Sequence, residues 1–118
     1  MQRSKAETYL GFCIRAGKLV CGVNAAACTK GVYLLVADIG VAKNSRKEIF
    51  KLKEKFACPL VFAENLEGAV KKANCKLAAV KDRSLAQAIW NESAEEGNAP
   101  FVRYKESTKE DESGKAEG

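Results

Sequence analysis

Histidine is absent from this sequence of 118 residues. Because histidine is the commonest general base and the usual partner of a nucleophilic serine or cysteine, its absence removes the best-known hydrolytic pairs. Five cysteines are present, at positions 13, 21, 28, 58 and 75, and no two have the C-x-x-C spacing. Structural zinc sites use clustered Cys or Cys with His, so we expect no metal and no cofactor. We predict that the protein is not an enzyme.

Long hydrophobic stretches are also absent. The longest apolar runs, at 32–37 and 59–63, are far too short to span a bilayer. The first ten residues, MQRSKAETYL, carry charges and lack the apolar region of a signal peptide. We therefore expect a cytoplasmic protein that does not contact membranes. In the cytoplasm we expect free thiols instead of a disulfide framework, because the cysteine count is odd.

Acidic residues are scarce in most of the chain. Residues 1–91 contain 16 Lys and Arg against 7 Asp and Glu, whereas residues 92–118 contain 4 against 8. A body this basic is typical of a protein with a polyanionic partner, although solvated lysine faces account for the charge equally well. From 105 onward no hydrophobic residue is larger than alanine. We predict one domain at 1–96 and an acidic, disordered tail at 97–118.

Helix and strand signals alternate along the chain. Strands are predicted at 18–21, 32–37, 60–63 and 76–80, and residues 101–104 are expected to pair with a sheet edge or to pack locally. Helices are predicted between them, with Gly17 and Gly31 as stops for the first two. The predicted helix-starting residues are Ser4, Asn24, Ser45, Asn65 and Asp82 or Ser84. This alternation favours an α/β fold with helices on both faces of the sheet.

The stretch 15–31, RAGKLVCGVNAAACTKG, places glycine next to lysine and suggests a phosphate ligand. It is not a P-loop, because Leu19 follows Gly17-Lys18 where Ser or Thr is required, and no G-x-G-x-x-G follows a strand. The turn at Gly22-Val23-Asn24 suits nucleic acid better. Backbone N–H groups at a helix start attract anions, and the Asn24 amide can hydrogen-bond a purine edge. An ordinary turn with an N-cap explains these residues as well.

Further cations surround this turn in the sequence. Lys18 and Lys30 flank it, and Lys43, Arg46 and Lys47 lie near the start of the third predicted helix. On that helix Lys47, Lys51 and Lys55 recur every four residues and form one basic edge. Either the edge binds phosphates or it is a solvated helix face.

Residues 8–90 resemble the kink-turn RNA-binding ribosomal proteins of the L-seven-Ae and L-thirty-e type, in particular the bacterial YlxQ-like branch. The matching stretches are LGFCIRAGKLVCGVN, VYLLVAD, NSRKEI, ACPLVFAENLEGAVKKA and KLAAVKD, in that order. The resemblance implies an α/β fold, a three-layer α/β/α sandwich with a small mixed four-stranded sheet. It also implies RNA recognition by two segments, the helix start after the first strand and the loop before the last strand.

The family's site residues map onto this sequence position by position. Gly22, Val23 and Asn24 match the Gly-x-Asn that contacts tandem sheared G·A pairs, and Lys18 matches the Lys of the family's Gly-Lys. The loop that covers the flipped-out nucleotide corresponds to Ala73, Asn74, Cys75 and Lys76. Two positions depart from the family: its acidic residue after Asn is Ala25 here, and its lysine further along the helix is Cys28.

These observations support three functional hypotheses. The first is a ribosome-associated, monomeric protein that binds structured RNA, such as a kink-turn in rRNA or an mRNA leader. The second is a protein-interaction module of the same fold that has lost kink-turn binding, as Ala25 and Cys28 suggest. The third is a thiol enzyme or redox sensor that uses Cys21 or Cys28, which the lack of histidine disfavours.

Overall fold

The computed structural model describes residues 5–95 and 99–104, in which helices and strands alternate as expected. The strands are β1 Leu19–Cys21, β2 Leu34–Asp38, β3 Leu60–Ala63, β4 Leu77–Val80 and β5 Phe101–Arg103. The helices are α1 Lys5–Arg15, α2 Val23–Ala27, α3 Lys43–Phe56, α4 Leu66–Val70 and α5 Arg83–Glu92. The α/β class predicted from the sequence is confirmed.

The sheet is mixed, with the strand order β1-β4-β2-β3-β5. Only β2 and β3 run parallel, whereas β4 is antiparallel to β1 and β2, and β5 is antiparallel to β3. The prediction of four strands is wrong, because residues 101–103 add a fifth by pairing with the sheet edge, one of the two outcomes expected for residues 101–104. Phe62 pairs with Val102, which covers the outer edge of β3. A three-residue strand is too short to show a period in the sequence, and its pairing partner lies about forty residues away.

The fifth strand belongs to the segment 97–118 that we expected to be an acidic tail. Phe101 is buried, and the N–H of Tyr104 donates to the carbonyl oxygen of Leu60 at 2.8 Å. This segment therefore contributes to the sheet as far as Tyr104. The predicted disorder of 105–118 concerns residues outside those that the structure describes.

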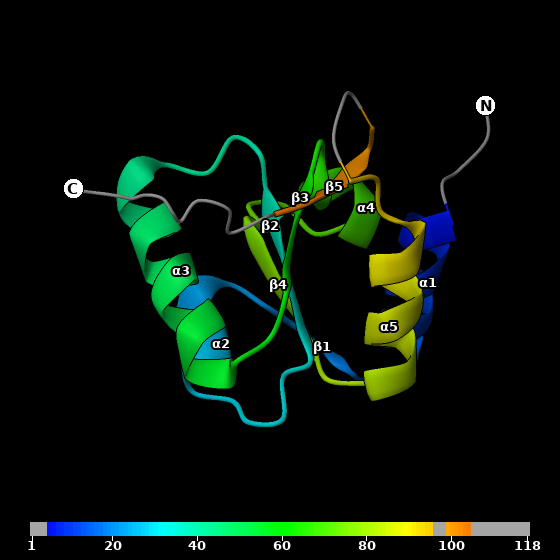
Figure 1. Ribbon diagram of the computed structural model, residues 1–118, viewed down its shortest axis with the longest axis horizontal. Helices are drawn as coiled ribbons and strands as arrows, with labels where there is room; N and C mark the ends of the chain where they lie inside the picture. Colours follow the sequence, from blue (N-terminus) through cyan, green and yellow to red (C-terminus); the bar gives the residue numbers. More distant parts are fainter. Residues whose placement is uncertain (1–4, 96–98, 105–118) are drawn as a thin grey trace.

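Helices cover both faces of the sheet (Figure 1). Helices α1, α4 and α5 lie on one face, and α2 and α3 lie on the other. The buried strand β2 packs against helices on both faces of the sheet. Leu34 and Val36 belong to the cluster under α1, α4 and α5, and Leu35 and Ala37 belong to the cluster under α2 and α3. This alternation explains why a continuous apolar run forms the central strand.

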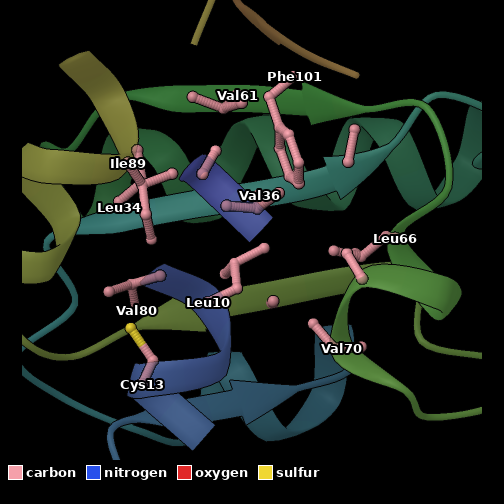
Figure 2. Close-up of a cluster of buried hydrophobic side chains, with 14 of the residues drawn as sticks. Leu10, Cys13, Leu34, Val36, Val61, Leu66, Val70, Val80, Ile89 and Phe101 are labelled. Atoms are coloured by element: carbon pink, nitrogen blue, oxygen red, sulfur yellow. The ribbon is translucent and has the colours of Figure 1, made fainter. Parts of the chain in front are cut away.

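The core beneath α1, α4 and α5 joins segments from the whole chain. Figure 2 shows Leu10 of α1, Ile89 of α5 and Phe101 of β5 meeting in one cluster. All three side chains are at most 4% exposed. This packing fixes the helices against the sheet and so positions the loops at both sheet ends.

Of the predicted helix-starting residues, Asn65 and Asp82 act as N-caps, whereas Ser45 does not. The side-chain oxygen of Asn65 accepts from Gly68 N at 3.1 Å, and that of Asp82 accepts from Leu85 N at 2.9 Å, so both predicted N-caps are confirmed. The predicted Ser45 cap is wrong. Helix α3 begins at Lys43, and its N-cap Ala42 makes no side-chain bond. Ser4 lies outside the described residues.

Candidate nucleic-acid interface

Helix α2 begins one residue earlier than the sequence suggested. Gly22 is the N-cap, with φ 100 and ψ 146, a backbone conformation that side-chain-bearing residues rarely adopt. The prediction of Asn24 as N-cap is therefore wrong: Asn24 is the second helical residue and is exposed. Its amide makes no hydrogen bond with any residue that the structure describes, so it can bind a ligand.

The same helix is also shorter than predicted. It ends at Ala27 with Cys28 as its C-cap, whereas the expected end was Lys30. Five residues make little more than one turn, so the attraction of its dipole for an anion contributes little. Any anion binding here must depend on side chains and on neighbouring segments.

The loop before β4 lies directly beside the start of α2. The Gly22 N–H donates to the carbonyl oxygen of Leu77 at 2.8 Å, and Cys21 pairs with Ala78 in the adjacent ladder. The candidate residues of this loop are Ala73, Asn74, Cys75 and Lys76. Cys75 is buried, and the other three are exposed. The structure thus brings together the two segments that the sequence placed about fifty residues apart.

The backbone of this loop is held in an unusual conformation. Asn74 has φ 64 and Lys71 has φ 57, both in the left-handed region. Asparagine tolerates this region better than most residues, whereas lysine is strained there. Lys71 is the C-cap of α4, a position where a left-handed residue is common, and Asn74 is exposed in the loop that follows.

Lys76 is not a free cation. Its Nζ lies 3.5 Å from Glu67 Oε2 and 3.8 Å from Asp38 Oδ2. Asp38 is only 7% exposed and also accepts from Leu66 N at 3.0 Å and Gly40 N at 2.8 Å. Sequence reasoning missed Asp38 as an organiser of this end of the sheet. The signal was present, since it is the one charged residue of a buried apolar strand.

The start of α3 lies at the same end of the sheet. Asp38 N donates to Lys76 O at 2.9 Å, and residues 39–42 lead from there to α3. Arg46 is held against the body, because its guanidinium lies 5.1 Å from the Phe62 ring centroid and donates to Ile39 O at 3.4 Å. Lys43 and Lys47 are exposed. Their ammonium groups form no ion pair with any described residue.

The predicted basic edge of α3 is only partly available. Lys55 Nζ donates to the carbonyl oxygen of Ala27 at 2.8 Å and so closes the end of α2. Lys51 lies 3.4 Å from Glu48. Lys55 therefore contacts α2, Lys51 pairs within α3, and Lys47 is the member of the stripe with an unpaired charge.

Gly17, Lys18 and Lys30 do not join this group. Lys18 O accepts from Lys81 N at 2.8 Å, and Leu19 pairs with Val80, at the opposite end of β1 from Gly22. Four residues of extended chain separate Lys18 from Gly22 by about 13 Å. Lys30 follows the end of α2 on the segment that leads to β2. The cluster predicted from the sequence is therefore divided between the two ends of the sheet.

Two thiols meet where the two loops touch. The Cys75 Sγ lies 3.4 Å from Leu77 O, and its hydrogen can alternatively be donated to the sulfur of Cys21. Donation to Cys21 stabilises the Cys21 thiolate, which lowers the pKa of Cys21 and raises the pKa of Cys75. All five cysteines are free thiols.

Two kinds of feature are absent from residues 5–95 and 99–104. They contain no group of three or more His, Cys, Asp or Glu residues that could hold a metal ion. None of the helices in this part of the chain is long and apolar enough to cross a membrane.

Comparison with known proteins supports the fold. No protein-family model matches the chain, and no curated protein matches it. A solved structure described as that of a protein with unknown function from Bacillus halodurans is similar, with a TM-score of 0.64 and 20% sequence identity. The similarity covers 75% of this chain and 96% of the other. At this identity the likeness shows a shared fold only.

Proposed function

We propose that the protein is a non-enzymatic, ribosome-associated RNA-binding protein that recognises kink-turn or similar RNA with sheared G·A pairs. The observation that carries the proposal is the hydrogen bond from Gly22 to Leu77, which holds the α2 start beside the loop at 73–76. A family-type α/β/α sandwich, as implied by the resemblance to kink-turn binders, is part of the same proposal.

The chemistry of this edge suits a kinked RNA. The unpaired Asn24 amide offers both donors and an acceptor to a base edge in a shallow groove. Exposed lysines without ion pairs among the described residues lie at the same end of the sheet and contact phosphates: Lys43 and Lys47 on α3, Lys71 and Lys72 before β4. Base contacts from Asn24 then determine specificity, and the lysines supply affinity.

A protein-interaction module is the second candidate. Ile39 is 59% exposed next to the α3 start, and Ala25 and Cys28 present small uncharged surface on α2. Exposed apolar and small uncharged side chains favour a protein partner over phosphates. Direct RNA binding distinguishes the two candidates.

The test compares an RNA containing tandem G·A pairs with a fully paired duplex of equal length, at several salt concentrations. We expect tighter binding to the G·A RNA. Replacing Asn24 by alanine (Asn24→Ala) should reduce that preference by about 1–3 kcal/mol, the value of a good base contact. Asn91→Ala on α5 is the control, because it removes another exposed amide, which accepts from Gln87 on the other face. Equal affinity of the wild type for both RNAs would exclude kink-turn recognition and favour the interaction module.

A further inference from the structure

An open cavity of about 420 Å³ lies at the end of the sheet opposite the candidate interface. Tyr33, Pro59 and Trp90 provide its apolar walls, and Arg83, Ala86 and Gln87 of α5 complete the lining. The position follows from the ladder: Tyr33 N donates to Val80 O at 2.9 Å, whereas Gly22 is bonded to Leu77 at the other end of β4.

The two aromatic rings of the cavity are held in different ways. Trp90 is held by Arg103, whose guanidinium lies 4.8 Å from the ring centroid and whose Nε donates to Trp90 O at 2.9 Å. Tyr33 is 46% exposed immediately before the buried strand β2. Large exposed aromatic surface is costly in water, and a ring on a rigid strand loses little entropy when a flat partner stacks on it.

One cation lines the cavity, and two lysines belong to the backbone at the same end of the sheet. Arg83 lines it, and Lys81 and Lys18 are joined by the hydrogen bond from Lys81 N to Lys18 O. None of the three forms an ion pair with another described residue. The neighbouring Asp82 carboxylate accepts from Leu85 N at 2.9 Å, so it is used as the cap of α5.

We propose that this cavity is a second nucleic-acid site, which binds an unpaired nucleobase of a single-stranded RNA segment. The base stacks on Tyr33 beside Trp90, and Arg83 with Lys81 and Lys18 binds the flanking phosphates. Lys18, which the sequence associated with the α2 start, lies at this end of the sheet instead. The inference goes beyond the proposed function and does not depend on it, because the two sites lie at opposite ends of the sheet.

Charge favours RNA over the other ligand class that aromatic and proline walls attract, a proline-rich peptide. Such peptides dock by ring contacts and need no cluster of cations. An unpaired arginine in a cavity with two aromatic rings, with two further lysines at the same end of the sheet, matches a polyanion with flat bases. The choice of RNA is therefore made by charge complementarity.

The protein contains a single tryptophan, so Trp90 reports on its own cavity. Excited selectively, its fluorescence should be quenched when a short oligouridine without base-pairing capacity binds. We expect Tyr33→Leu, which keeps an apolar side chain, to weaken this binding by about tenfold or more, the loss typical of one stacked base. Arg83→Gln should lower the salt dependence by about one phosphate contact.

Matched controls come from elsewhere on the surface. Phe12→Leu removes a ring that is 41% exposed on α1, and Lys51→Gln removes an exposed charge on α3. Both variants should bind the oligouridine as the wild type does. The oligouridine and an RNA with tandem G·A pairs should bind together without competing.

Each outcome is decisive for the second site. Quenching that Tyr33→Leu and Arg83→Gln reduce, and that the controls leave unchanged, supports it even if no kink-turn RNA binds. Absence of quenching, or equal binding by Tyr33→Leu, overturns it even if kink-turn RNA binds at Asn24. Quenching by a proline-rich peptide but not by oligouridine would also overturn it.

Discussion

Cys21 and Cys75 are the residues at which the candidate interface is most sensitive to chemistry. They sit where β1, the α2 start and the loop before β4 meet, next to the bond between Gly22 and Leu77. Cys21 is half-buried and Cys75 is buried, so a reagent reaches Cys21 first. The hydrogen bond from Cys75 lowers the pKa of Cys21, and Lys72 acts in the same direction.

We expect Cys21 to react with iodoacetamide at a lower pH than an ordinary thiol, because the thiolate is the nucleophile. Cys75→Ala removes the hydrogen bond and should shift the pH profile of Cys21 alkylation upward. Mass spectrometry of the labelled peptides measures the rate, and the exposed Cys28 in the same molecule is the internal reference. An unchanged profile in a folded Cys75→Ala variant would show that the two thiols do not interact.

At the scale of elements, α2 is the segment whose surface distinguishes the two candidate functions. Ala25 and Cys28 stand three residues apart and are both exposed, while Ala26 between them is fully buried. Their side chains can therefore be enlarged without touching the core. The resembled family carries an acidic residue and a lysine at these two positions.

Introducing this pair, Ala25→Glu with Cys28→Lys, should strengthen binding to an RNA with tandem G·A pairs. The gain is expected to be on the order of tenfold, within the range for one good polar base contact. Titration of the RNA into the wild type and the double variant measures it, and a melt confirms that both are folded. No gain in a normally folded variant would mean that α2 does not contact this RNA.

The fifth strand makes a second prediction at this scale. Phe101 is 4% exposed and packs into the cluster of Figure 2, whereas the neighbouring Val102 is half-buried. Phe101→Ala should lower the free energy of unfolding by about 3–5 kcal/mol, the usual range for a buried phenylalanine. Urea denaturation measures it, and Val102→Ala should cost clearly less. A similar small loss for both would contradict the packing of β5.

At the scale of the whole molecule, several thiols are buried in the core, so the folding stability changes with pH in the alkaline range. Burial raises the pKa of Cys13 to about 12 and that of Cys58 to about 11, from an ordinary value of 9.0. The pKa of Cys75 is also raised, while that of Cys21 is lowered. As the pH rises, the unfolded chain therefore loses the thiol protons of Cys13, Cys58 and Cys75 before the folded chain does.

The sign of the effect follows from proton binding. For Cys13 and Cys58 the folded state holds more protons than the unfolded state above the ordinary thiol pKa, so stability falls with rising pH there. Cys21 has the opposite effect. The stability that its lowered pKa contributes is present above its unfolded pKa and is lost as the pH falls through its folded pKa. Because the pKa is raised for three thiols and lowered for one, we expect a net loss of folding stability as the pH rises into the alkaline range.

Cys58→Ala should reduce that loss, because one buried proton no longer titrates. The comparison is the change in unfolding free energy between neutral and alkaline pH, so a constant cost of the substitution cancels. Cys28→Ala is the control, since Cys28 is exposed. An identical pH dependence in wild type and Cys58→Ala would refute the explanation.

Local features of the sequence predicted most of the elements. The continuous apolar runs located β2, β3 and β4, and the Asn65 and Asp82 caps marked two helix starts, because local pattern and capping depend on residues close in the chain. The same reasoning failed at Asn24 and Ser45. Both are good N-cap residues, but the chain entered the helix before reaching them.

Only the tertiary structure decided which of these local features lie together. The antiparallel pairing of β1 with β4 brings Gly22 to Leu77 and sends Lys18 to Lys81, so one cluster in the sequence becomes two sites in space. The pairing of β5 with β3 likewise extends the sheet beyond the expected end of the domain. Strand pairing joins residues about forty to sixty positions apart, and no local period or propensity carries that information. The sequence by itself determined the composition of the elements and their order, and the register of the sheet determined which cations lie at the end with Asn24 and which at the end with Tyr33.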